Sequence, residues 1–362
     1  MRALTAVLIA LSFCFSLSAF AQQDARPALA PAPAGTPAVS ASAVDRRVSL
    51  DVVVTDKSGK PVSGLQQQDF ILLDDKQPQT ILFFQAVDGS AKADPPQQAI
   101  LLVDAVNTSY QGVVFERQQL QKFLQQNGGQ LPLPMSLLLL ADKSAQIQPV
   151  PIRDGNALVA ALDSNHTGLR SITRSQGFYG GVERVQISLL ALQRLASYEQ
   201  TQPGRKLLIW LSPGWPLLSG PGVELSTKDQ QGLFNTIVSL SAALRGARVT
   251  LYSIDPLGMA DAGSVRMVYY KNFLKGVSSP NKVQGGDLGL QVVAAQTGGQ
   301  VLNSSNDLTS LIESCLADAK AFYTLSFTSP PADGPNDYHS LQVKISKPGL
   351  IARTRTGYYA QP

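Results

Sequence analysis

Three mostly apolar runs constrain the fold of this chain more than any other feature of its sequence. They are "AILLVD" at 99–104, "RKLLIWL" at 205–211 and "RVTLYSI" at 248–254. Runs of this kind are typical of strands that are buried on both faces of a parallel sheet. Helical patterns with one apolar side lie between them, at 115–127, 181–200 and 226–247. Strands that alternate with helices predict an α/β fold with a doubly wound, mostly parallel sheet.

Both ends of the chain show a β pattern instead. "VSLDVVVTD" alternates apolar and polar residues from Val48, and two more strands are expected at 70–73 and 80–86. About three further strands are expected in "FYTLSFTSPP", "YHSLQVKISKPG" and "IARTRTGYYA". Either set alone would leave one face uncovered. We therefore predict one Ig-like β-sandwich formed by residues 46–92 and 321–362, with the α/β domain at 95–320 inserted into it.

The first 45 residues are expected to lie outside this folded part. Residues 1–21 are predicted to be a signal peptide, because Arg2 precedes an apolar stretch that closes with the small residues Ala19 and Ala21. Residues 22–45 are rich in Pro and Ala and are predicted to be a disordered tether. No later run is long enough to span a bilayer. We expect an exported protein, periplasmic or extracellular, with no transmembrane segment after signal removal.

Cysteine count and charge exclude several classes of function. Removal of the signal leaves Cys315 alone, so neither an intrachain disulfide nor a cysteine-based metal site is expected. The net charge is +4 and the basic residues are scattered, which argues against a partner such as nucleic acid. Arg353 and Arg355 alternate with other residues in the expected last strand and are predicted to lie on a solvated face.

Candidate functional residues follow the predicted parallel strands. In an open doubly wound sheet, ligands bind outside the carboxyl ends of the strands. We expect the loops at these ends to form a binding rim for a protein or glycan partner. For Trp215, burial under its Pro/Gly-rich loop is the alternative to an exposed position on this rim. The polar and aromatic residues in these loops are Asp104, Asn107, Thr108, Ser109, His166, Ser212, Trp215 and Asp255.

The pieces "LLVDAVNTSY", "KLLIWLSPGW" and "VTLYSIDP" resemble the secreted von Willebrand factor A-related proteins of Acidobacteria. The resemblance implies an A-type α/β domain, a role in adhesion or complex assembly, and a cation site built on an Asp-x-Ser-x-Ser motif. Asp104 matches the first ligand of that motif and Thr108 can replace its second serine. Val106 offers no side-chain ligand, and Pro213 stands where the family has an acid. We expect a degenerate site without a cofactor; Mg²⁺ or Ca²⁺ at Asp104 and Thr108 is the alternative.

Residue requirements also argue against two enzyme mechanisms. An aspartyl nucleophile at Asp104 would need a second acid where Val106 stands. A serine nucleophile at Ser212 would need an N–H on the next residue, which Pro213 lacks. Asp104 is instead expected to organise its loop through local backbone hydrogen bonds. We predict a non-enzymatic exported binding, adhesion or complex-assembly module. The alternatives are a metal-dependent adhesin and a secreted hydrolase of unrecognised type.

Overall fold

A computed structural model describes residues 46–88, 96–141, 145–147, 150–164, 177–216, 218, 224–258 and 266–361. The predicted signal peptide, the predicted tether and His166 lie outside these ranges. The described residues belong to one unit, Ala41–Pro362. Among them, no helix combines the length and the apolar character that a bilayer crossing requires.

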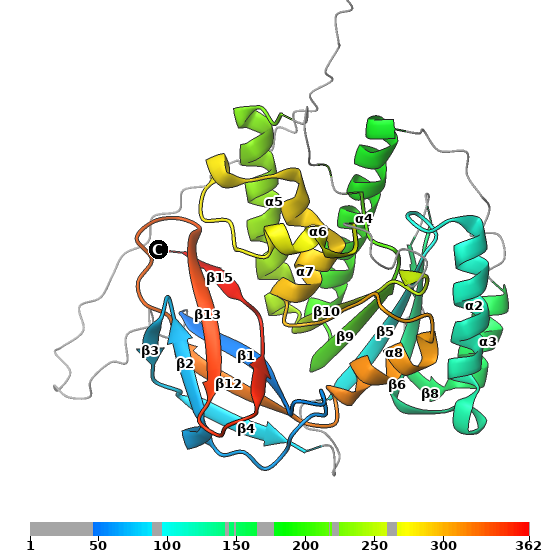
Figure 1. Ribbon diagram of the computed structural model, residues 1–362, viewed down its shortest axis with the longest axis horizontal. Helices are drawn as coiled ribbons and strands as arrows, with labels where there is room; N and C mark the ends of the chain where they lie inside the picture. Colours follow the sequence, from blue (N-terminus) through cyan, green and yellow to red (C-terminus); the bar gives the residue numbers. More distant parts are fainter. Residues whose placement is uncertain are drawn as a thin grey trace, which may run out of the picture. The chain divides into compact units, whose positions relative to one another are not determined.

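The central sheet has the order β11-β10-β9-β5-β6-β7, and β8 also pairs with β6 (Figure 1). Its strands run parallel except for β7 and β8, which are antiparallel to β6. Counted along the chain from β5, with β8 left out, this is the order 3-2-1-4-5-6 of doubly wound sheets. The predicted α/β class is therefore confirmed. The strands are β5 Gln97–Asp104, β6 Gln130–Leu140, β7 Ala145–Ile147, β8 Ile152–Asp154, β9 Arg205–Leu211, β10 Val249–Ile254 and β11 Val301–Leu302.

Helices cover both faces of this sheet, which is why its strands are apolar throughout. In β5, Ile100 and Leu102 pack into the core beneath α4, α5 and α7, whereas Leu101 and Val103 pack into the core beneath α2, α3 and α8. Figure 1 shows α4 and α5 on one side of the sheet and α2 and α3 on the other. The helices are α2 Tyr110–Leu124, α3 Gly155–Ser164, α4 Gly177–Gln200, α5 Thr227–Gly246, α6 Arg266–Tyr269, α7 Leu290–Gln296 and α8 Leu308–Ala317.

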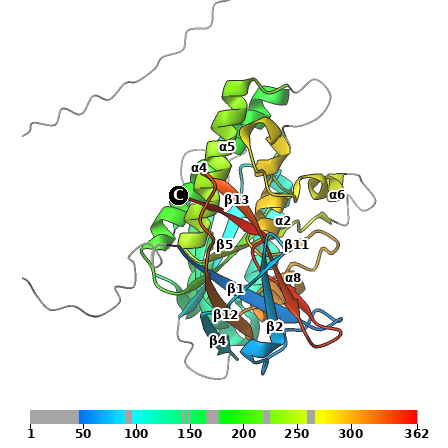
Figure 2. The same ribbon diagram turned by 90° about the vertical axis from the view of Figure 1, so that its left-hand side faces the viewer.

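Strands from both ends of the chain form two antiparallel sheets, with the orders β14-β1-β12-β4 and β15-β13-β2-β3. β1 and β12 lie side by side in both views although they come from opposite ends of the sequence (Figures 1 and 2). One hydrophobic core, which includes Val52, Leu72, Leu325 and Val343, lies between the two sheets. The strands are β1 Arg47–Thr55, β2 Phe70–Asp74, β3 Gln77–Gln79, β4 Phe83–Val87, β12 Phe322–Thr328, β13 Asp337–Ile345, β14 Ile351–Arg353 and β15 Gly357–Ala360.

Two predicted strands of these sheets are divided in the structure. The strand expected at 80–86 begins only at Phe83, because residues 80–82 carry the chain from β3 in one sheet to β4 in the other. "IARTRTGYYA" is likewise not one strand. It contains β14 and β15, which belong to different sheets, and Arg355 lies in the connection between them.

Ion pairs and hydrogen bonds connect the antiparallel sheets to the central α/β part. Arg248, which precedes β10, contacts Asp51 of β1 at 2.6 Å, and Arg353 of β14 pairs with Asp318 after α8. The Tyr359 hydroxyl donates to the Val277 carbonyl at 2.9 Å. Arg353 therefore does not lie on a solvated face as predicted. The domain boundaries at 92–95 and 320–321 remain a prediction.

Candidate functional site

The carboxyl ends of β5, β9 and β10 meet at one edge of the central sheet, which we call the carboxyl edge. Asp104 is the last residue of β5, Ser212 follows β9, and Asp255 follows β10. Backbone pairing continues past the strand ends, since Ser212 N donates to the Ile254 carbonyl at 2.9 Å. The structure thus brings these three predicted site residues to the same edge.

Asp104 is fully buried and both of its carboxylate oxygens are hydrogen-bonded. Oδ1 accepts from the backbone N–H groups of Val106 and Asn107, each at 2.9 Å. Oδ2 accepts from Asn107 Nδ2 at 2.8 Å and from Trp210 Nε1 at 2.9 Å. Burial raises the pKa of Asp104, and these donors oppose that effect. The backbone bonds give Asp104 the loop-organising role that the sequence predicts.

This hydrogen bonding leaves Asp104 a poor ligand for a hard cation. A carboxylate offers about four lone-pair sites, and four donors occupy those of Asp104. Val106 contributes no side-chain oxygen, and Pro213 supplies no acid. Ca²⁺ takes six to eight oxygen ligands, and Mg²⁺ takes six, of which one or two are usually carboxylates and several are waters. The residues present at the carboxyl edge do not fit either ion without breaking part of this network.

Glu116 of α2 is a buried acid near this network that the sequence interpretation missed. Both of its carboxylate oxygens lack a hydrogen-bond partner among the described residues, as does the hydroxyl of Thr108. Burial raises the pKa of Glu116 well above its usual value, and the charge of Asp104 raises it further. Thr108 lies close enough to lower that pKa slightly, although the two side chains do not reach hydrogen-bond geometry. Glu116 is three residues after buried Val113, so helical spacing could have revealed it.

Three predicted rim residues have local structural roles, and two of them, Trp215 and Ser212, are buried. Trp215 is only 3% exposed and packs edge-to-face on Trp210, with ring centroids 5.2 Å apart. Ser212 is fully buried and its hydroxyl accepts from Gly214 N at 3.1 Å. Ser109 is the N-cap of α2, accepting from Gly112 N. The prediction that Trp215 and Ser212 line an accessible rim is therefore wrong, because the loop after β9 folds back onto the sheet.

The remaining two rim residues also make local contacts. Asn107 donates from Nδ2 to Ser188 Oγ of α4 at 2.9 Å as well as to Asp104. Asp255 is partly buried, and its Oδ1 accepts from Leu257 N at 3.1 Å. These bonds join the loops after β5 and β10 to their surroundings and leave few polar groups of the predicted set directed to solvent.

Exposed apolar side chains surround the same edge. Tyr110, at the start of α2, is 58% exposed, and Tyr179, at the start of α4, is 83% exposed. Leu257 follows β10 and is also exposed. A Cβ on Gly112 would lie 3.6 Å from Leu257, and a Cβ on Gly181 would lie 3.5 Å from Pro216. Because Gly112 and Gly181 are close to the two tyrosines in sequence, these contacts place both helix starts at the carboxyl edge.

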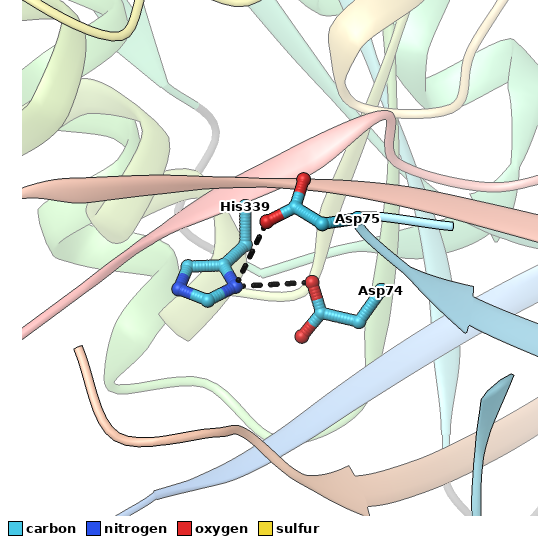
Figure 3. A group of neighbouring side chains, drawn as sticks. All are labelled: Asp74, Asp75 and His339. Carbon is cyan, nitrogen blue, oxygen red and sulfur yellow. Dashed lines mark hydrogen bonds and ion pairs between the residues drawn. The ribbon is translucent and has the colours of Figure 1, made fainter. Parts of the chain in front are cut away.

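A second polar cluster is formed by residues at the end of β2 and on β13 (Figure 3). His339 Nδ1 is 3.1 Å from Asp74 and 3.4 Å from Asp75, and Nε2 is 3.5 Å from Asp337. Asp74 also accepts from the Tyr358 hydroxyl at 2.7 Å. Nδ1 is within hydrogen-bond distance of Asp74, whereas Nε2 has no hydrogen-bond partner among the described residues. The cluster fastens the β2–β3 turn to β13.

No protein-family model and no curated protein matches the sequence. Among solved structures, the chain is similar to a point mutant of the PilB minor pilin from Streptococcus sanguinis, with 12% identity, a TM-score of 0.32, and coverage of 62% of this chain and 63% of the pilin. It is also similar to the pilus adhesin SpaC from Lactobacillus rhamnosus GG, with 10% identity, a TM-score of 0.35, and coverage of 81% and 49%. The chain thus spans less than two thirds of the pilin and about half of the adhesin. Similarity at these TM-scores is too low to carry an argument about function, which therefore rests on the geometry of the chain itself.

Proposed function

We propose that this chain is an exported, non-enzymatic binding module that recognises a protein or glycan partner at its carboxyl edge. The proposal includes a von Willebrand factor A-like unit inserted into a β-sandwich. Its support is the strand order of the central sheet, the antiparallel strand at one end of it, and the core shared by strands from both ends of the chain. Export rests on the sequence of residues 1–21.

One observation carries the proposal. At the edge where doubly wound proteins bind ligands, the candidate reactive groups Asp104 and Ser212 are buried and hydrogen-bonded within the protein, whereas the surface presents Tyr110, Tyr179 and Leu257. Tyrosine is enriched at recognition surfaces, because it combines a large apolar area with a hydroxyl group. An edge of this kind favours recognition over chemistry.

The metal-dependent alternative has weaker support. It requires Asp104 and Thr108 to coordinate Mg²⁺ or Ca²⁺, and Asp104 would first have to release at least one of its four donors. The hydrolase alternative requires an accessible nucleophile or a free acid beside a base. Ser212 is buried and is followed by Pro213, which has no N–H to stabilise an oxyanion.

The proposed binding edge can be tested by capture of a partner from the envelope of the producing cell. We expect the double variant Tyr110→Ser, Tyr179→Ser to lose about tenfold or more of the capture seen with the unaltered chain, since aromatic side chains dominate many interfaces. Its thermal midpoint should not change, because both side chains are exposed.

Tyr198 provides a matched control for this experiment. It is exposed near the end of α4, on the same helix as Tyr179 but toward the opposite edge of the sheet. Tyr198→Ser should retain full capture. Equal capture by the double variant and the unaltered chain would show that the partner binds elsewhere.

A further inference from the structure

A cavity of about 270 Å³ lies where β1 meets the end of α5 and the start of β10. Four arginines line it: Arg47, Arg245, Arg248 and Arg355. The lining contains one acid, Asp51, so its formal charge is 4 − 1 = +3. We call this feature the arginine cavity. Its residues come from positions 47–51, 245–250, 297 and 354–355, so no basic run in the sequence reveals it.

The one acid of the arginine cavity is already paired. Asp51 Oδ1 accepts from Arg248 at 2.6 Å and from the Thr324 hydroxyl at 3.0 Å, and Oδ2 lies 3.4 Å from Arg248 Nε. Arg47 is exposed and donates to Ser326 Oγ. Asp51 therefore compensates Arg248, and little of its charge remains for Arg245 and Arg355.

Arg355 is the unusual member of the cavity. It is 8% exposed and forms no hydrogen bond or ion pair with any described residue. Arg245 is partly buried and likewise forms none within the described part of the chain. Burial and the neighbouring charge of Arg245 together lower the pKa of Arg355 to about 10, and the charge of Asp51 opposes this shift. Arg355 still carries its charge at neutral pH, so two unpaired cations lie side by side at this cavity.

Unpaired buried cations are costly, and the usual compensation is an anion. Removing a charge from water destabilises a protein unless hydrogen bonds and an opposite charge replace the lost hydration. Guanidinium groups match the geometry of carboxylate, sulfate and phosphate, to which they donate two parallel hydrogen bonds. The volume is slightly below the usual range for sites that bind drug-sized molecules, which suits a small ligand.

We infer that the arginine cavity is a binding site for a small oxyanion, held between Arg245 and Arg355 through its carboxylate, sulfate or phosphate group. The site lies at the N-terminal end of β10, whereas the proposed partner surface lies at the carboxyl edge. It is therefore independent of the proposed function. The bound anion would replace the missing counter-charge and stabilise the junction between the antiparallel sheets and the central α/β part.

The test is a set of calorimetric titrations of the exported form of the chain with sodium phosphate, sodium sulfate and sodium glucuronate. Ionic strength is held constant with sodium chloride, and glucose is the neutral control. At least one oxyanion should bind with a stoichiometry of one and raise the thermal midpoint by a few degrees at saturation. Binding of glucuronate alone assigns the site to acidic sugars, and binding of phosphate or sulfate assigns it to tetrahedral anions.

Two variants and a control make this test specific. Arg355→Gln and Arg245→Gln should each weaken oxyanion binding by about tenfold or more, because each removes a charged donor. Arg245→Gln alters a partly exposed helix surface and should fold normally. Arg194→Gln, on the exposed side of α4, should bind as the unaltered chain does. The inference is overturned if no oxyanion binds saturably, if chloride raises the midpoint equally, or if the cavity variants bind like the control.

Discussion

Asp104 at the carboxyl edge and Arg355 in the arginine cavity are both buried ionisable groups, but only Asp104 has its hydrogen bonds supplied by the protein. At the carboxyl edge, Asp104 receives four hydrogen bonds from its own loop and from Trp210. In the arginine cavity, Arg355 receives no partner from any described residue. The family resemblance indicated Asp104 as the candidate ligand, but Asp104 is satisfied. Two side chains without hydrogen-bond partners among the described residues are Glu116 near Asp104 and Arg355 at the other end of the sheet.

This difference separates a structural charge from one that requires a ligand. A buried ion whose hydrogen bonds are complete stabilises its surroundings as long as its partners remain. A buried ion without partners keeps most of its desolvation cost until something binds it. Substitution of single side chains, three of them buried acids, should therefore separate satisfied from unsatisfied groups.

The largest effect is expected for Asp104→Ala. The change leaves the indole N–H of Trp210 and two backbone N–H groups without an acceptor, and the Asn107 side-chain amide keeps only Ser188. We expect the free energy of unfolding in urea to fall by about 3–5 kcal/mol. Asp104→Asn keeps one acceptor oxygen, so its free energy of unfolding should lie between those of the unaltered chain and Asp104→Ala. A loss below about 1 kcal/mol for Asp104→Ala, within the range of ordinary surface changes, would mean that Asp104 is not the organiser of this loop.

Glu116→Gln should increase the free energy of unfolding at pH 7.5, which is opposite to the effect of Asp104→Ala. Glu116 is buried without a hydrogen-bond partner among the described residues, and Asp104 repels its charge. The pKa of native Glu116 lies well above the unfolded value of 4.5, so the free energy of unfolding contributed by this residue falls as the pH rises above 4.5. Removing the charge should stabilise the protein at pH 7.5 by about 2 kcal/mol and flatten this pH dependence. Urea unfolding from pH 4.5 to 8 measures both effects, and destabilisation at pH 7.5 would reveal a partner for the charged form.

Asp287 is an intermediate case, because one backbone N–H, that of Gln284, donates to it. Burial raises its pKa from 3.8 to about 6. Native Asp287 therefore keeps its proton where the unfolded chain has lost it, and the free energy of unfolding falls as the pH rises from 3.8 to about 6. After allowance for solvent screening, we expect a fall on the order of 1–2 kcal/mol, absent in Asp287→Asn. Thermal unfolding at pH 4, 5, 6 and 7 measures it, and identical pH profiles for the two proteins would contradict it.

The smallest effect is expected for Ser109→Ala. Ser109 was predicted from the sequence as a rim residue, and the structure makes it the N-cap of α2. Its loss should cost about 1 kcal/mol of unfolding free energy and leave partner capture unchanged. Ser226→Ala, at the N-cap of α5, is the matched control and should cost a similar amount. Reduced capture by Ser109→Ala without reduced stability would show that Ser109 contributes to partner binding and not to helix capping.

The parts of the fold that depend on local pattern were predictable. β5, β9 and β10 each coincide with an apolar run. Ser226 is the N-cap of α5, a position at which serine is favoured. Cys315, the one cysteine expected after signal removal, is a buried free thiol in α8. Strands from both ends of the chain share one core, as the need of each set for a second sheet indicated, but the pairing of β1 with β12 was not predicted.

Features that depend on distant contacts were not predictable. Trp215 is covered because it meets Trp210 on the sheet, and Trp210 in turn bonds to an acid 106 residues away. Alternation suggested a solvated face for Arg355, but the chain changes sheets at that point and turns the side chain inward. Arg245 and Arg355 are neighbours only in the folded protein, so neither charge pattern nor spacing predicted the arginine cavity.

The most direct test of the metal-free carboxyl edge is the thermal midpoint of the unaltered protein in Mg²⁺, in Ca²⁺ and in EDTA at constant ionic strength. We predict the same midpoint in all three solutions, because Asp104 has no lone pair free for a cation. A saturable rise with either ion that EDTA reverses and Asp104→Asn abolishes would contradict this account and restore the metal-dependent adhesin.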